Sequence, residues 1–415
     1  MKKYIPILIL FFLIKDPLKA QPVLKLEEVL TAIQSNHPEM EMYEAQIRSM
    51  DEAAKGARSW APPDLGAGFY MTPYDLSMIK ATPTEKGMGA FMVSASQMFP
   101  NKKEQNAKDN YLESLSMVSK ENKQFSLFNL FAEAKKNYFE WMMINRKIDV
   151  LNSDEKLLKF MIESTELRYK NNLGKLNAYY KAKASLGKIE DQREILQNEI
   201  QQKRIVLNTL MNRDKNENFG VDTNYTLKNY VAVDTNYLIE SRSDIKAIDQ
   251  DSKINRLQLV LERTKQLPKF GVQYNHMFAF GKRPMQFSLM LMMRIPLAPW
   301  SSGSYRADIE SLKWKDREYA ARRQSLINEA SGEVENLLSS IASKKRQLQL
   351  FKENIIPALK KNYQVMQMAY EQNTGELFEL LDAWETLNMT QLDYLDQLQQ
   401  LLDLQVQMDK TLQQN

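Results

Sequence analysis

Apolar residues recur at spacings of three and four along two long stretches of the chain, 103–212 and 307–414. This period is typical of amphipathic helices. Both stretches are rich in Glu, Lys, Gln, Leu and Ala, which favour helix formation. A helix of ~45 residues would be about 68 Å long, and such a helix needs a partner along its whole length. The pattern therefore predicts long helices that pack as coiled coils, with a kink or restart at Pro357.

A period of two marks two β-hairpins, at about 63–100 and about 268–296. From Phe270 to Phe280 and from Phe287 to Ile295, apolar side chains alternate with smaller or more polar ones, and the same holds around Phe91. Strands of about 9–11 residues can cross a bilayer at a tilt. His276 falls on the apolar set of its strand. The alternative is a small soluble sheet packed on the helices.

One stretch of sequence occurs twice. YKNNLGKLNAYYKAKASL begins at Tyr169 and YEQNTGELFELLDAWETL begins at Tyr370, with Tyr, Asn, Gly, Leu, Ala and Leu at matching offsets. Asn-Leu-Gly and Asn-Thr-Gly interrupt the helical pattern with turn residues in these two stretches. We interpret the chain as a duplicated half-molecule. The repeats are 21–240, which ends in a linker at 213–240, and 241–415.

Each repeat has the same predicted order of elements: a short helix, a β-hairpin and then long helices. The short helices run from Leu26 to about Arg58 and from Ser243 to about Gln266. Before the first repeat, residues 1–20 combine two lysines with a short apolar run and a small residue at Ala20. This is the pattern of a secretory signal peptide, with an uncleaved interfacial anchor as the alternative. No later segment offers about 18 consecutive apolar residues.

Composition excludes several kinds of site. The charges are nearly balanced, with 56 Lys and Arg against 52 Asp and Glu, which argues against nucleic acid as a partner. The chain has no Cys, so it has no disulfide, no thiol chemistry and no lipid-anchored cysteine. Two His residues do not make a multi-His metal site. No nucleophile–base pair or cofactor loop occurs, so we expect no cofactor and no enzyme activity.

Four strands cannot close into a barrel, and an open sheet edge is not tolerated inside a membrane. If the strands cross a bilayer, several copies of the chain must therefore share one barrel. Two copies would supply eight strands with a filled lumen, and three would supply twelve with room for water. The long helices would continue from the barrel as a second, helical tube. Met92, Met290 and Met292 would face the lumen. Their thioethers suit Cu(I) or Ag(I), and the alternative role for methionine is packing.

The order of several segments resembles the TolC-like outer-membrane efflux family. These segments are LKLEEVLTAIQSNHPEM near the start, RSDIKAIDQDSKI at 242–254, IIPALKKNY at 355–363 and the two repeated stretches. SASQMFPNKK at 94–103 is similar to the branch that exports heavy metals. The resemblance implies a homotrimer with a twelve-stranded β-barrel and a twelve-helix α-barrel. It also implies a tripartite complex with a periplasmic adaptor and an inner-membrane pump.

In that family the channel is passive, lies in outer-membrane lipid and extends its helical barrel into the periplasm. The two repeated stretches would then form the tips of helical hairpins that contact the adaptor; the alternative is ordinary helix-connecting turns. The tip residues are Asn172, Leu173, Gly174, Lys175, Thr374, Gly375, Glu376 and Leu377. The family's tip glycine falls at Asn172 and Asn373, and asparagine tolerates the same left-handed conformation.

Glu379 and Asp382 lie three residues apart, on one face of a helix just after the second tip. The resemblance implies acidic gate residues in this region, where a trimer would form two acidic rings. The alternative is a solvated face that pairs with Lys or Arg. For the whole protein, the second hypothesis is a secreted coiled-coil scaffold or adhesion protein with no channel.

Overall fold

The computed structural model describes residues 22–170, 176–232, 234–296 and 298–414. The signal peptide predicted for 1–20 and the first tip at Asn172–Lys175 lie outside these residues. The chain divides into two compact units. The first comprises Met1–His37, Leu130–Asn229 and Ser340–Gln407, and the second comprises Pro38–Asn129, Tyr230–Ser339 and Met408–Asn415. None of the described helices has both the length and the hydropathy needed to cross a bilayer.

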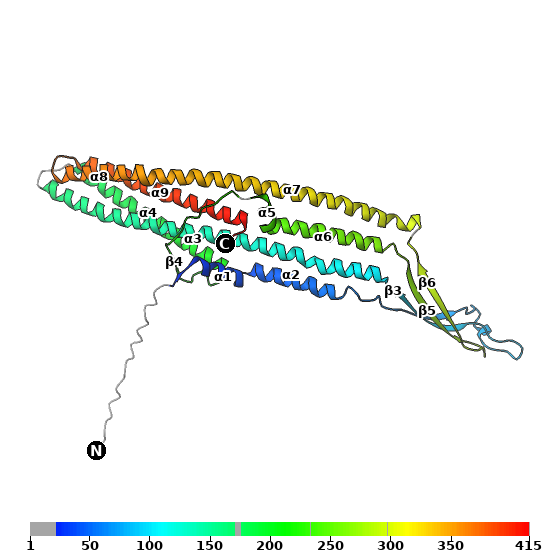
Figure 1. The fold of residues 1–415 in the computed structure, drawn as a ribbon. Coiled ribbons are helices and arrows are strands. Elements are labelled where there is room, and N and C mark those ends of the chain that lie inside the picture. Colours follow the sequence, from blue (N-terminus) through cyan, green and yellow to red (C-terminus); the bar gives the residue numbers. More distant parts are fainter. Residues whose placement is uncertain (1–21, 171–175, 233, 297, 415) are drawn as a thin grey trace, which may run out of the picture. The chain divides into compact units, whose positions relative to one another are not determined.

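The first unit is built from two helical hairpins. One joins the second half of α3 (Lys102–Lys170) to α4 (Leu176–Leu210), and the other joins α8 (Ile356–Glu371) to α9 (Leu377–Leu412). These helices lie side by side (Figure 1). The buried core includes Ile144, Leu151, Leu158, Ala182, Ile189, Leu196, Leu380, Leu381 and Trp384. Several of these positions are seven residues apart, which is the spacing of coiled-coil packing predicted from the apolar pattern.

The predicted interruption at Pro357 is present. α7 (Pro299–Leu350) passes into a π-helical turn at Phe351–Ile355, and α8 begins at Ile356 with Pro357 in its first turn. The N–H of Ile356 donates to the carbonyl of Phe351, five residues earlier. Proline has no N–H to continue the α-helical ladder, so the chain inserts an extra residue and starts a new helix.

The predicted helix from Leu26 to about Arg58 is two helices, α1 (Leu26–Asn36) and α2 (Pro38–Lys55). His37 is extended, with φ −68° and ψ 128°, because the ring of Pro38 disfavours the helical conformation in the residue before it. The break coincides with the boundary between the two units. The single-helix prediction was therefore wrong at this point.

Short elements in the first unit tie the chain's start to the linker at 213–240. β1 (Val23–Leu24) pairs in parallel with β4 (Gly220–Val221). The hydroxyl of Tyr138 donates to the carbonyl of Leu24 and accepts from the N–H of Asp222, both at 2.9 Å. Burial raises the pKa of Tyr138 to about 12, so the hydroxyl keeps its proton. The linker also contains α5 (Thr235–Ser241), in the second unit.

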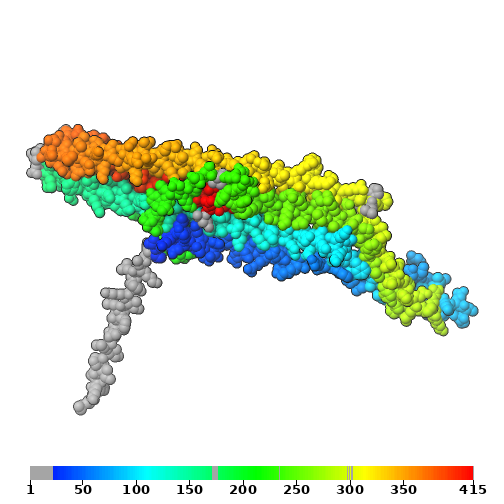
Figure 2. Space-filling view, viewed as in Figure 1, coloured from blue at the N-terminus to red at the C-terminus, as the bar shows by residue number. Residues whose placement is uncertain are grey.

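The second unit contains α2, α6 (Ser243–Thr264), parts of α3 and α7, and one antiparallel sheet. Its strands are β2 (Asp64–Tyr70), β3 (Ala90–Phe99), β5 (Lys269–Ala279) and β6 (Gln286–Arg294), in the order β2-β3-β5-β6. A 3₁₀ turn, η1 (Leu76–Ile79), lies in the loop after β2. β3 and β5 pair along their length, so the two predicted hairpins form a single sheet. The strands extend away from the helices of this unit (Figures 1 and 2).

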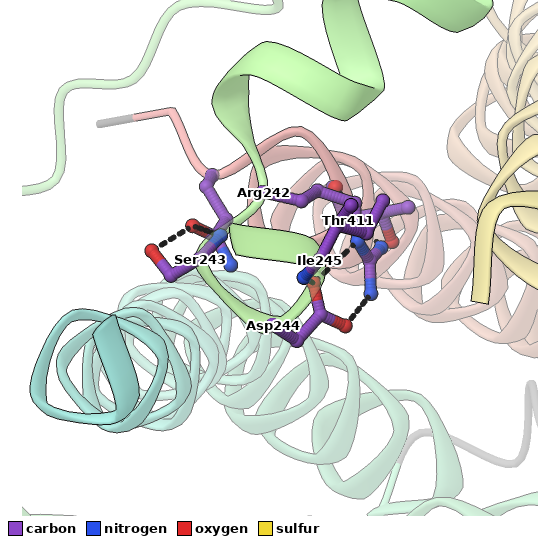
Figure 3. A network of polar contacts seen from close by, with 6 residues as sticks. Arg242, Ser243, Asp244, Ile245 and Thr411 are labelled. Carbon is purple, nitrogen blue, oxygen red and sulfur yellow. Dashed lines mark hydrogen bonds and ion pairs between the residues drawn. The ribbon is translucent and has the colours of Figure 1, made fainter. Parts of the chain in front are cut away.

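The Arg-Ser-Asp-Ile segment at 242–245 holds the C-terminal end of α9 against the start of α6 (Figure 3). The guanidinium of Arg242 donates to both carboxylate oxygens of Asp244, at 3.0 and 2.6 Å, and to the carbonyl of Thr411 at 3.2 Å. The backbone N–H and hydroxyl of Ser243 both donate to the amide oxygen of Gln413, at 2.9 and 2.7 Å. Arg242 thus satisfies one of the carbonyl groups that a helix leaves unpaired at its end.

Replacing Asp244 with alanine should lower the free energy of unfolding by about 3 kcal/mol, because it leaves a largely buried guanidinium without its counter-ion. The side chains of Arg242 and Asp244 are only 12% and 16% exposed. Asp249→Ala is the matched control on the same helix, since its pair with Arg323 is more exposed and should contribute less than about 1 kcal/mol. Denaturant unfolding in detergent measures both. If both variants lost the same free energy of unfolding, the pair of Arg242 and Asp244 would not stabilise the protein more than an exposed pair does.

Candidate functional site

The register of the sheet assigns its side chains to two faces. Directly opposed residues share a face, and alternate residues along a strand share a face. Phe91 of β3 lies opposite Phe69 of β2 and Phe278 of β5, so these three rings belong to one apolar face. The other members of this face include Leu65, Ala67, Val93, Val272, Tyr274, His276, Phe287, Leu289 and Leu291. His276 thus lies on the apolar side, as predicted.

The apolar face is open to solvent in the single chain. Leu291 is 86% exposed, Leu65 is 77% and Phe69 is 74%. Aromatic rings touch across the strands, with 5.7 Å between the centroids of Phe69 and Phe91 and 6.1 Å between those of Tyr274 and Phe287. A continuous apolar surface of this kind marks a contact with lipid or with another protein. Within the described residues, the outer strands β2 and β6 each pair with only one neighbour.

The opposite face is polar and rich in methionine. Its members include Gly66, Gly68, Met92, Ser94, Ser96, Met98, Gln273, Asn275, Met277, Ser288, Met290 and Met292. The amide of Asn275 donates to the hydroxyl of Ser288 at 2.9 Å, and the amide of Gln273 donates to Asn275 at 3.1 Å. Met92, Met290 and Met292 therefore share one face of the sheet, and their place in a lumen stays a prediction. Sequence reasoning missed Met98 and Met277, which the same alternation assigns to this face.

The second tip is a turn of Schellman type between α8 and α9. Asn373 has φ 60°, in the left-handed region, and its N–H donates to the carbonyl of Tyr370 at 3.2 Å. The N–H groups of Thr374 and Gly375 both donate to the carbonyl of Ala369, at 2.9 and 3.0 Å. These bonds satisfy the last carbonyls of α8. Asn373 thus adopts the left-handed conformation predicted for it, whereas Asn172 lies outside the described residues.

The turn is anchored on the core of the first unit. Arg168 donates to the carbonyl of Tyr370 at 2.8 Å and lies 4.1 Å from the centroid of its ring. Thr374 and Glu376 are exposed, whereas Gly375 is half-buried. Leu377 is 6% exposed and belongs to the buried core. Leu377 therefore holds the tip in place, and the surface available to a partner consists of its exposed neighbours.

Glu379 and Asp382 are both exposed on the first turns of α9. Neither carboxylate is in an ion pair with any residue that the structure describes. Lys181 of α4 contacts other residues of α9. It lies 4.1 Å from the ring centroid of Phe378 and 3.8 Å from Glu385. Among the described residues, both predicted gate carboxylates thus lack a counter-ion.

A buried carboxyl group lies deeper in the same helical hairpins. The indole N–H of Trp384 donates to Asp154 at 2.9 Å, which joins α9 to α3 inside the core. Burial raises the pKa of Asp154, and the hydrogen bond from Trp384 opposes this shift. Across the described residues, no three His, Asp or Glu side chains are placed to hold a metal ion.

We compared the chain with known protein families, curated proteins and solved structures. No family model matches the sequence, and no curated protein matches it. Among solved structures, the outer-membrane channel OprN superposes with a TM-score of 0.75, at 16% identity, over 94% of this chain and 90% of its own. The chain has the fold of an outer-membrane channel.

Two further structures agree. CusC, which forms a transmembrane channel, matches with a TM-score of 0.75 at 13% identity and covers 94% of this chain and 92% of its own. The outer membrane protein VceC from Vibrio cholerae matches with a TM-score of 0.72 at 14% identity, over 93% and 95%. The channel fold thus extends over nearly the whole chain.

Proposed function

We propose that this chain is the outer-membrane channel of a tripartite export system. It passively conducts substrates that an inner-membrane pump and a periplasmic adaptor deliver. The observation that carries the proposal is the division of the four strands into an exposed apolar face and a polar face. A membrane-spanning strand needs this division, with lipid on one side and water on the other.

The two edge strands require other copies of the chain. A bilayer does not tolerate unpaired backbone groups, so the edges of β2 and β6 must pair with other protomers. Three copies give a twelve-stranded barrel with a lumen wide enough for water. The helices of three copies form a twelve-helix barrel in the periplasm, as in the TolC-like family. The resemblance of residues 94–103 to its heavy-metal branch favours metal ions over drugs as cargo.

The tips contact the adaptor in this proposal. The exposed residues Thr374 and Glu376, with the first tip at 172–175, form the contact surface. Glu379 and Asp382 make two acidic rings close behind it and act as the periplasmic gate. The fold resemblance to channel proteins over nearly the whole chain does not favour the alternative of a secreted coiled-coil scaffold.

The two faces of β6 allow a direct test. Leu289→Lys puts a charge on the apolar face, which should cost about 2–4 kcal/mol in the bilayer. Ser288→Lys puts the same charge on the polar face of the same strand, where water can solvate it. We expect SDS-resistant oligomers in the outer-membrane fraction to be nearly lost in the first variant and retained in the second. If both variants insert equally well, or if the purified protein is a monomer soluble without detergent, the channel proposal is wrong.

A further inference from the structure

Five methionines lie on the polar face of the sheet, at three levels along the strands. Met98 and Met292 are at the level of Gly271, Met290 is opposite Gln273, and Met92 is directly opposite Met277. Levels two residues apart along a strand are separated by about 6.6–6.8 Å. The methionines therefore form a row of thioether groups on the face that we propose to contact water. Burial of apolar surface does not explain bulky apolar side chains on that face.

The level of Gly271 brings two of these side chains together. Met98 and Met292 flank Gly271 on its two neighbouring strands. The sulfur of Met98 lies over the glycine, since a β-carbon at Gly271 would clash with it. The α-carbons of Met98 and Met292 are two strand spacings apart, about 10 Å. The missing side chain at Gly271 thus leaves room for two methionines to meet above it.

The chemistry of this arrangement is that of a soft-metal site. Thioether sulfur is a soft ligand that prefers Cu(I) and Ag(I) over hard cations. The chain has no cysteine to compete for such an ion, and His276 lies on the opposite face. On one side of this level, the neighbouring groups of the face are uncharged amides and hydroxyls. On the other side are Lys269, which pairs with Glu104, and Arg294, so neither side favours a hard divalent cation.

We propose that Met98 and Met292 bind a soft monovalent cation above Gly271, and that the other methionines of this face provide further weak sites along its path. The inference rests on the proposed function, because it takes this face to line the lumen. Two neutral ligands bind an ion weakly, and a series of weak sites lets an ion enter and leave, which conduction requires.

Ag(I) binding to the full-length protein in detergent tests the proposal. Equilibrium dialysis in a chloride-free nitrate buffer gives the affinity, and X-ray absorption at the silver edge shows whether sulfur is the ligand. The test variant is Met98→Leu with Met292→Leu, which keeps side-chain volume nearly constant. The control is Met293→Leu, next in sequence but on the apolar face. We expect the affinity of the tightest site to fall roughly tenfold or more in the test variant and to stay unchanged in the control.

The outcomes separate this inference from the proposed function. Replacing all five methionines with leucine should remove saturable Ag(I) binding, whereas K⁺ conductance in planar bilayers should persist because leucine leaves the pore equally wide. If the wild-type protein binds no more Ag(I) than the five-leucine variant, or if Met293→Leu weakens binding as much as the double variant, the metal site is overturned while the channel stands. A protein that binds Ag(I) through sulfur but never conducts would overturn the channel instead.

Discussion

Replacing Gly375 with proline should abolish export through the channel while leaving it in the outer membrane. The N–H of Gly375 donates to the carbonyl of Ala369 at 3.0 Å, and proline has no N–H to replace this bond. A β-carbon at this position would also lie 2.9 Å from that of Ala369. The turn must therefore open, which moves the exposed Thr374 and Glu376 out of the position that we propose for adaptor contact.

The measurement is resistance to a pump substrate in cells that carry the matching adaptor and pump. We expect Gly375→Pro to reduce resistance to the level of a strain without the channel, with normal amounts of oligomer in the outer membrane. Asn373→Gly is the matched control, because glycine adopts φ 60° readily and preserves the turn. Full resistance in the proline variant would show that the tip is not the adaptor contact.

The second large effect concerns the gate. Replacing both Glu379 and Asp382 with alanine should leave the trimer intact and raise single-channel conductance severalfold. Both carboxylates are exposed in the single chain, so their removal costs little folding free energy. In a trimer they would form two acidic rings that hold cations at the narrow end of the pore. Without these rings, bound cations no longer obstruct the passage, and block by multivalent cations should disappear.

Planar-bilayer recordings give both readouts. Glu385→Ala is the control on the same helix, since it removes a carboxylate that lies 3.8 Å from Lys181. We expect its conductance and its sensitivity to multivalent cations to match those of the wild-type channel. If the double variant also behaves as wild type, Glu379 and Asp382 do not form the gate.

The apolar periodicity of the chain predicted most helices and strands, because buried positions recur with a period that the geometry of each element sets. The strands at 269–279 and 286–294 lie within the predicted hairpin, since alternating burial is a local property of a strand. Turn residues likewise predicted the break after Glu371 and the left-handed Asn373. By contrast, the helical pattern did not predict the break at His37, although the following Pro38 disfavours a helical conformation there.

At the candidate sites, local sequence patterns did not predict which residues would be in contact. Leu377 belongs to the repeated tip sequence, yet its burial depends on α3, α4 and α8 packing around it. The pairing of Met98 with Met292 across Gly271 depends on the register of three strands. No spacing within one strand predicts which residue of another strand lies opposite.

By itself, the sequence determined the long helices, the two hairpins, the turn at the second tip and the division of β3, β5 and β6 into two faces. These features depend on residues close together in the chain. The tertiary structure alone decided that β3 pairs with β5, that β1 pairs with β4 and that Ser243 meets Gln413. Such contacts join residues distant in sequence, and many pairings satisfy the same local pattern. The packing of the whole chain selects one of them.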